Sequence, residues 1–139
     1  MAKVAIKLEE ASNRIAGICN GRAGIQAAYI FGSHAKGNKE KANDIDVAVL
    51  LDDDESGSFP LLSMISDLEK AIGCRVDLVV LNRAGELLKY EVRRAGKLIF
   101  ERSPETRKKF EIRGRKSYED FRYLHKRYVD RVLYGEKNG

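Results

Sequence analysis

Near the middle of the chain, positions 44–51 read DIDVAVLL, an aliphatic run that opens with two carboxylates. A run of this length with this content of Val, Leu and Ile predicts a buried β-strand. Side chains alternate between the two faces of a strand, so Asp44 and Asp46 point to one face and Ile45 to the other. Because an isolated buried charge is costly, this pair of carboxylates requires partners.

The segments on either side of this strand predict an α/β fold, with a small mixed sheet and helices packed on it. Apolar residues at helical spacing predict amphipathic helices, and short apolar runs that end at glycine or polar turns predict strands. The last helix is expected to start with Ser103 as N-cap and Pro104 at its first position, and Gly114 is expected to bend or break it. The expected helices span residues 4–19, a stretch that starts around Ser58 and Pro60 and ends at Ile72, residues 84–94 and the region after 103. The expected strands span 25–31, 44–51, 75–81 and 97–101.

A third carboxylate, Asp77, lies inside the strand expected over residues 75–81. If that strand lies beside the one over 44–51, Asp77 joins Asp44 and Asp46. Mg²⁺ takes hard oxygen ligands, usually one or two carboxylates together with substrate phosphates. Three such carboxylates can hold two metal ions about 3.5–4 Å apart, one of which lowers the pKa of an attacking hydroxyl.

The segment FGSHAKG at positions 31–37 has the composition of a phosphate-binding turn. Gly32 lets the backbone approach a phosphate closely, the Ser33 hydroxyl can donate a hydrogen bond, and Lys36 can add a positive charge. Alone, a Gly-Ser pair is more often a plain turn, and an Asp-x-Asp pair is often a solvated strand end. Their combination, with ten residues between Ser33 and Asp44 and a third acid in the next strand, favours a functional site.

With these motifs the sequence resembles the minimal nucleotidyltransferases of the DNA polymerase β superfamily. The resemblance rests on Gly32-Ser33, Asp44-Ile45-Asp46 and Asp77, and it covers roughly residues 25–101. It implies that Gly32 and Ser33 hold a nucleoside triphosphate, that Asp44 and Asp46 bind Mg²⁺, and that Asp77 helps to activate the acceptor hydroxyl.

The chain departs from the pattern of this family in two places. The family often has arginines where this chain has His34 and Lys36, and often a serine where Asn43 precedes the first aspartate. Neither departure removes a metal ligand. A lysine lacks the bidentate fork of arginine, so the phosphate clamp is expected to be weaker or differently shaped.

The length of 139 residues narrows the resemblance to the small antitoxin branch, because larger members carry domains for which this chain has no room. Members of that branch are encoded with a HEPN-type ribonuclease toxin and transfer AMP from ATP to a tyrosine of the toxin, which silences it. The resemblance therefore implies an Mg²⁺-dependent protein adenylyltransferase that forms a hetero-oligomer with its toxin. We expect a nucleotidyltransferase core over residues 1–102 and a basic helical extension over 103–139, whose segment from Tyr118 to Arg122 resembles the tail of that branch.

The composition, with 43% hydrophobic and 34% charged residues, is that of a soluble globular protein. No apolar run reaches the length of a signal peptide or the ~18 residues of a membrane span, so we expect a cytoplasmic protein without a membrane partner. Cys19 and Cys74 lack the spacing of a metal site and are expected to be reduced core residues.

Positive charge gathers in the second part of the chain. The net charge is +5, but residues 1–82 carry −3 and residues 83–139 carry +8. From Tyr118 onward, aromatic residues alternate with Arg and Lys, a pattern that could contact RNA by stacking and phosphate pairing. We favour the interpretation in which an apolar stripe packs on the domain or on a partner helix. This stripe contains Phe121, Leu124, Tyr128 and Val132.

Two other functions stay open from the sequence. A steric antitoxin would block a toxin with the basic tail and keep a vestigial nucleotide site, and the intact Asp44, Asp46 and Asp77 argue against it. A nucleotidyltransferase acting on a small molecule or an RNA end would need a surface for that acceptor, for which a short chain leaves little room unless an oligomer or partner completes the site.

Overall fold

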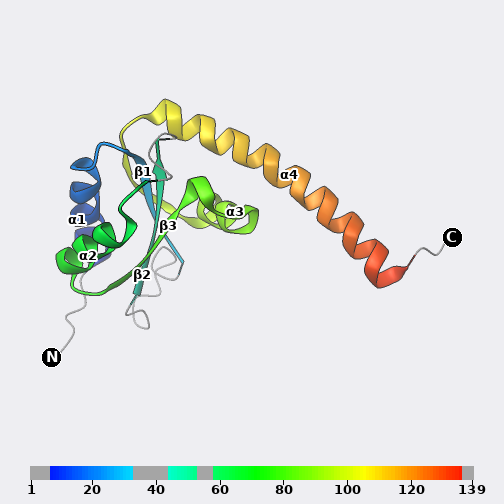
Figure 1. Cartoon of the computed structure of the whole chain (residues 1–139), viewed down its shortest axis with the longest axis horizontal. Helices are drawn as coiled ribbons and strands as arrows, with labels where there is room; N and C mark the ends of the chain where they lie inside the picture. The colour runs from blue at the N-terminus through cyan, green and yellow to red at the C-terminus, as the bar shows by residue number, and fades with distance from the viewer. Residues whose placement is uncertain (1–6, 33–43, 53–57, 136–139) are drawn as a thin grey trace.

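The computed structural model describes residues 7–32, 44–52 and 58–135. Figure 1 shows one body of strands and helices, from which the last helix projects. Along the chain the elements are α1 (Leu8–Asn20), β1 (Ile25–Phe31), β2 (Asp44–Leu51), α2 (Leu61–Ile72), β3 (Arg75–Val80), the short 3₁₀ helix η2 (Leu81–Arg83), α3 (Glu86–Ala95), β4 (Lys97–Glu101) and α4 (Pro104–Tyr134). The α/β fold expected from the sequence is confirmed.

The four strands form one mixed sheet in the order β3-β2-β1-β4. β1 is antiparallel to both β2 and β4, whereas β2 and β3 are parallel and are joined by α2. β1 therefore ends at the same end of the sheet at which β2, β3 and β4 begin. We call it the carboxylate end, because Asp44 and Asp46 lie there at the start of β2.

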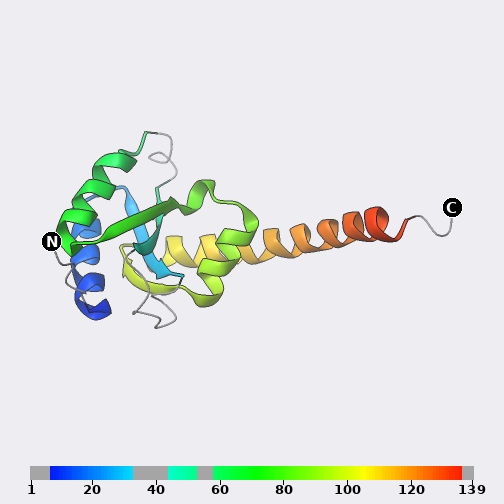
Figure 2. The same ribbon diagram turned by 90° about the horizontal axis from the view of Figure 1, so that it is seen from below.

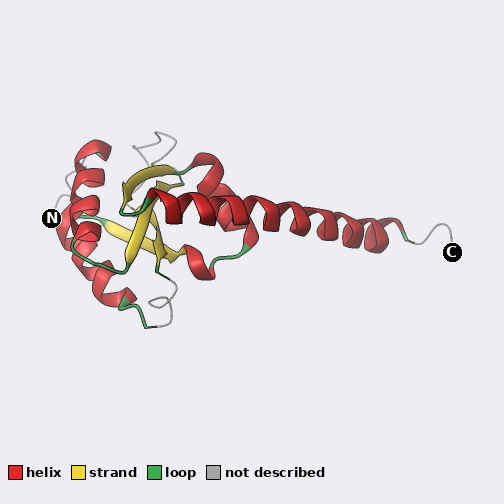
Figure 3. Ribbon diagram, turned by 90° about the horizontal axis from the view of Figure 1, so that it is seen from above, coloured by secondary structure: helices red, strands yellow, loops and turns green. Residues whose placement is uncertain are grey.

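Helices cover both faces of the sheet. α1 and α2 pack on one face, around Ile45, Val47 and Val49 of β2. α3 and the first turns of α4 pack on the other face, around Ala48 and Leu50. Figures 2 and 3 show the sheet with α1 and α2 on one side and α3 and α4 on the other. Each large side chain that is fully buried between these layers stabilises the fold by about 1.5–3 kcal/mol.

Four elements differ in their bounds from the expectation. The helix expected to start around Ser58 and Pro60 begins at Leu61, directly after Pro60. The helix expected over 4–19 begins at Leu8, and residues 1–6 lie outside the described part of the chain. The strand expected over 75–81 ends at Val80, because Leu81 turns into η2 and buries its side chain between the sheet and α3. The helix expected over 84–94 runs from Glu86 to Ala95.

α4 runs without a break through Gly114, which corrects the expectation of a bend or break there. Gly114 is buried against α3, where an added Cβ would lie 2.8 Å from Nη1 of Arg93. The glycine thus leaves space for the Arg93 guanidinium beside α4, at an intrinsic cost of about 1 kcal/mol in helix propensity. The expected start of α4 is confirmed, because the N–H of Thr106 donates to Oγ of Ser103 at 3.2 Å.

The two cysteines lie in the protein interior, as expected. Cys19 is buried, Cys74 packs at the margin of the same core, and they form no disulfide. Burial raises the pKa of the Cys19 thiol to about 12, so this thiol stays protonated at neutral pH. Among the described helices, none combines the length and the apolar character that a membrane span requires.

Candidate active site

Asp44 and Asp46 lie at the start of β2 on the face that α3 and α4 cover further along the strand. They alternate with Ile45, which is buried on the opposite face, and they share their own face with Ala48 and Leu50. Both carboxylates are partly exposed, and 44% of the Asp44 side chain is accessible. The expectation that this pair shares one face is confirmed.

The third carboxylate, Asp77, lies on the neighbouring strand directly opposite Asp46. β3 runs parallel to β2 in a register that pairs Asp46 with Asp77 and Asp44 with Arg75. Residues that pair in this way present their side chains to the same face of a sheet, so the three carboxylates share one face at the carboxylate end. Asp77 is exposed to solvent. In the described part of the chain, no three His, Cys, Asp or Glu side chains form a cluster that could hold a metal ion as it stands.

Gly32 brings the chain close to Asp46 where β1 ends. Phe31 is the register partner of Asp46, and the next residue, Gly32, has a φ of 76°. A Cβ at this position would collide with Oδ2 of Asp46, so the backbone conformation favours glycine and a side chain here would displace that carboxylate. The close approach that the structure shows is to this carboxylate. Contact of Gly32 with a phosphate stays a prediction, and Ser33, His34, Lys36 and Asn43 lie outside the described residues.

Arg75 is a further neighbour of the site, and the sequence motifs did not indicate it. Its Nε lies 3.9 Å from Oδ1 of Asp44, and its side chain is largely exposed. The spacing could have identified it, because the pattern Arg75-x-Asp77 matches Asp44-x-Asp46 when two parallel strands pair in register. The Arg75 guanidinium therefore places a positive charge within ion-pair distance of the Asp44 carboxylate.

The sheet face opposite the carboxylates packs on α1 and α2 and forms the main hydrophobic core. Ile45, Val47 and Val76 are buried there, on the face opposite the carboxylates. The strands that carry Asp44, Asp46 and Asp77 are therefore held by apolar packing that does not involve the carboxylates. The donor set consists of hard carboxylate oxygens on rigid strands beside a glycine, and this chemistry fits Mg²⁺ with bound phosphates.

A hydrogen-bonded network fixes the start of α4 on this same sheet face. The hydroxyl of Tyr29 donates to Glu111 at 2.8 Å, and Arg107 donates to Glu111 at 3.0 Å and to Glu101 at 3.3 Å. Burial, followed by the contact with Glu111, raises the pKa of Tyr29. Tyr29 pairs in register with Ala48, two residues along β2 from Asp46, and we assign the network to the attachment of α4.

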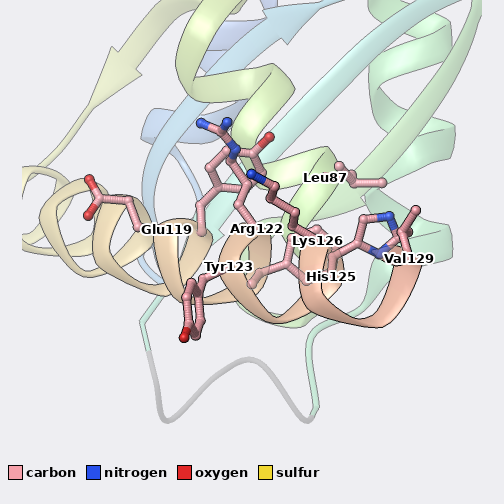
Figure 4. A pocket seen from close by; sticks show the side chains of 9 residues that line it. Leu87, Glu119, Arg122, Tyr123, His125, Lys126 and Val129 are labelled. Carbon is pink, nitrogen blue, oxygen red and sulfur yellow. The ribbon is translucent and has the colours of Figure 1, made fainter. Parts of the chain in front are cut away.

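A groove of about 670 Å³ lies between the start of α3 and the second half of α4 (Figure 4). Leu87 forms the α3 side of this groove, and none of the candidate catalytic residues lines it. The α4 side consists of Tyr118, Glu119, Phe121, Arg122, Tyr123, His125, Lys126 and Val129.

Comparison with known proteins points to a single family. Residues 13–105 match the family described as Polymerase beta, Nucleotidyltransferase. The chain is 26% identical over 117 residues to the protein adenylyltransferase MntA of Aphanizomenon flos-aquae, an alignment that covers 78% of each protein. It is 38% identical over 56 residues to MJ1379 of Methanocaldococcus jannaschii, a proposed protein adenylyltransferase, and this match spans 40% of the chain and 56% of that relative.

The fold matches solved structures over most of the chain. One chain of a crystal structure of a toxin-antitoxin with AMP-PNP superposes with a TM-score of 0.74 at 26% identity. The superposition covers 88% of the present chain and 98% of that one.

Proposed function

We propose a function for this chain from the premise that it belongs to the polymerase β nucleotidyltransferase family. It is an antitoxin that transfers AMP from ATP to a tyrosine of a HEPN-type toxin. The observation that carries the proposal is the pairing of β2 with β3, which gathers Asp44, Asp46 and Asp77 on one face beside Gly32. The names of the relatives support a protein as acceptor. The HEPN-type toxin is the partner that the sequence resemblance implies, and we place the reaction in the cytoplasm.

Asp44, Asp46 and Asp77 would hold Mg²⁺ in this proposal. When bound, the ion would neutralise charge on the phosphates and polarise the acceptor hydroxyl. Asp44 and Asp46 are adjacent on one face of one strand, so they present their oxygens in a fixed relation to each other. Positioning and electrostatics would supply most of the rate, as in other phosphoryl transfers.

In the proposed reaction the tyrosine oxygen attacks the α-phosphorus of ATP in line with the bond to the β-phosphate. The new bond joins the tyrosine oxygen to AMP, the bond to the β-phosphate breaks, and pyrophosphate leaves. Asp77, the exposed member of the three carboxylates, would accept the proton of the tyrosine hydroxyl. Gly32, Ser33 and Lys36 would hold the triphosphate, and a related solved structure that contains the ATP analogue AMP-PNP supports ATP as the nucleotide.

The test is transfer of label from ATP with Mg²⁺ into proteins, RNA and small molecules of a host lysate. Label from the α-phosphate on one protein, absent with γ-labelled ATP and absent with Asp44→Asn, is the expected result. Label on RNA or on a small molecule would retain the enzyme and replace the acceptor. The absence of any Asp44-dependent label would reject the enzymatic proposal in favour of a steric antitoxin.

A further inference from the structure

One apolar stripe runs along α4 and crosses from a covered to an uncovered region. Its members recur every three or four residues, which places them on one side of the helix. We call it the α4 stripe, and its members are Gly114, Ser117, Phe121, Leu124, Tyr128 and Val132.

The first half of the α4 stripe packs on the body of the protein. Gly114 is buried against Arg93, and the Ser117 hydroxyl donates to Glu86 of α3 at 2.7 Å. Beside them Tyr118 stacks on Tyr90 of α3, with ring centroids 4.2 Å apart. Up to this point the stripe is the contact surface between α4 and α3.

The second half of the α4 stripe continues the same surface without a covering element among the described residues. Leu124, Tyr128 and Val132 are 62%, 64% and 56% exposed. Figures 1 and 3 show this half of α4 projecting beyond the sheet and the other helices. An isolated apolar helix face of this kind is typical of a surface that buries itself against a partner helix.

The groove that Phe121 lines could accept a side chain of a partner. It lies where the stripe passes from the part packed on α3 to the exposed part. Leu87 of α3, itself exposed, lines it together with His125 and Val129 of α4 (Figure 4). A partner helix on the stripe would pass next to this groove. Aromatic and aliphatic anchors in such pockets carry much of the binding energy of protein interfaces.

The positive charge of α4 indicates which residues a partner would present beside the stripe. The helix contains 10 Lys and Arg residues against 5 Asp and Glu residues. Arg127 and Arg131 follow Leu124 and Tyr128 by three residues each, so they lie next to the stripe. A partner that presents Asp and Glu beside its own apolar residues complements this surface, because opposite charges across an interface favour association.

A second copy of this chain, or RNA, fits this surface less well than an apolar helix with acidic borders. Two copies of α4 would place a basic border against a basic border, which is unfavourable. In the exposed half of the stripe Tyr128 offers one ring on which a base could stack, and its neighbours Leu124 and Val132 offer none. The rings of Tyr118, Phe121 and His125 already stack on one another, with centroids 6.1 and 5.7 Å apart.

We infer that the second half of the α4 stripe is the docking face for an apolar helix of the toxin, bordered by acidic residues. This inference rests on the proposed function, because it takes the AMP-accepting toxin as the occupant. It separates two tasks within the chain: the carboxylate end carries the chemistry, and the projecting half of α4 holds the substrate protein.

The test uses the purified full chain and the acceptor protein identified by the labelling experiment. The double variant Leu124→Glu with Tyr128→Glu removes apolar contact and repels an acidic border, so its affinity for the toxin in calorimetry should fall about a hundredfold or more. Ile112→Glu is the matched control, because Ile112 is an equally exposed apolar residue of α4 that lies off the stripe. Both variants should keep the wild-type affinity for ATP with Mg²⁺ and the wild-type helix content.

The reversal of Arg127 and Arg131 to Glu tests the charged border separately. It should weaken toxin binding about tenfold at low salt, and the difference should shrink at high salt. Wild-type toxin affinity in the Leu124 and Tyr128 double variant would overturn the docking inference. The proposed function would survive that result if Asp44-dependent transfer of AMP persisted.

Two other outcomes would replace the occupant and so overturn the inference. One is a dimer of the free chain in sedimentation that the double variant dissociates. The other is binding of single-stranded poly(U) that the double variant abolishes. A labelling experiment that yields no protein acceptor would overturn the proposed function and this inference together.

Discussion

The two ends of β2 differ although they belong to one strand and one sheet face. At the carboxylate end this face carries Asp44 and Asp46, both partly exposed, and further along it carries Ala48 and Leu50, both buried. α3 and the first turns of α4 cover only the second pair. The position along the strand therefore decides whether a residue serves chemistry or packing.

The opposite face of β2 shows no such division. Ile45, Val47, Val49 and Leu51 are all buried in the core with α1 and α2. The strand is therefore anchored along its whole length from the other side. Substitutions at the carboxylate end are expected to change activity without unfolding the protein, and substitutions at the covered end to do the reverse.

The largest expected effect follows from Asp46→Asn. The amide keeps the shape but loses the charge, so AMP transfer should fall about a thousandfold or more, as measured with α-labelled ATP. The free energy of unfolding should change by less than about 0.5 kcal/mol, because the side chain is partly exposed. Asp52→Asn is the control and should transfer AMP normally, because Asp52 is an exposed carboxylate one residue past the covered end of β2. Equal loss in both variants would remove the distinction between the two ends.

Leu50→Ala should invert this pattern. Leu50 is buried beneath α3, so the cavity should lower the free energy of unfolding by about 2–5 kcal/mol in denaturant titration. AMP transfer per folded molecule should stay at the wild-type level. A stable Leu50→Ala protein that has lost its activity would show that the covered end takes part in the chemistry.

Gly32→Ala and Gly73→Ala test the backbone at the carboxylate end against a turn elsewhere in the fold. Both glycines have φ near +75°, so alanine should cost each about 1–2 kcal/mol of stability. Only at Gly32 would the new Cβ meet Asp46, whereas nothing lies within 4 Å at Gly73. AMP transfer should therefore fall about a hundredfold in Gly32→Ala and stay unchanged in Gly73→Ala. Similar activities of the two variants would contradict the role assigned to Gly32.

The smallest effect is expected at the helices that cover the packed end. Ser117→Ala removes the hydrogen bond that chiefly lowers the pKa of Glu86, and should cost about 1 kcal/mol at pH 7. Because the folded pKa lies below the unfolded one, this contribution is present at neutral pH and is lost as the pH falls through the folded pKa. Thermal unfolding of both proteins from pH 7 to pH 3 should show the difference disappear.

Ser63→Ala is the control for this pH dependence. Ser63 is exposed on α2, and its substitution should change the stability by less than about 0.5 kcal/mol at any pH. A stability difference for Ser117→Ala that does not vary with pH would show that the hydroxyl acts without Glu86.

The local sequence predicted the strands and most helices, because their signals are local. The run over 44–51 and the turn residues around it sufficed to predict β2, and Ser103 with Pro104 sufficed for the start of α4. Gly114 was misjudged as a break, because its role depends on Arg93, a residue of another helix. Strand 75–81 was predicted one residue too long, because burial of Leu81 against α3 is a tertiary effect.

The candidate site was predictable in residue types but not in arrangement. Asp44 and Asp46 follow from alternation along one strand, and the place of Asp77 beside them depended on which strands pair, which the structure shows. Arg75 was missed for the same reason, since its contact with Asp44 exists only through the register. Ser33 and Lys36 as phosphate ligands, and a domain boundary after residue 102, stay predictions.

AMP transfer to the toxin can be read from the intact mass of the toxin after incubation with this chain, ATP and Mg²⁺. We expect an increase by one or more whole AMP groups, located on a tyrosine by fragmentation and absent when Asp46→Asn replaces the wild type. An unchanged toxin mass, with the toxin nevertheless bound and inhibited equally by the wild type and by Asp46→Asn, would refute enzymatic neutralisation of the toxin.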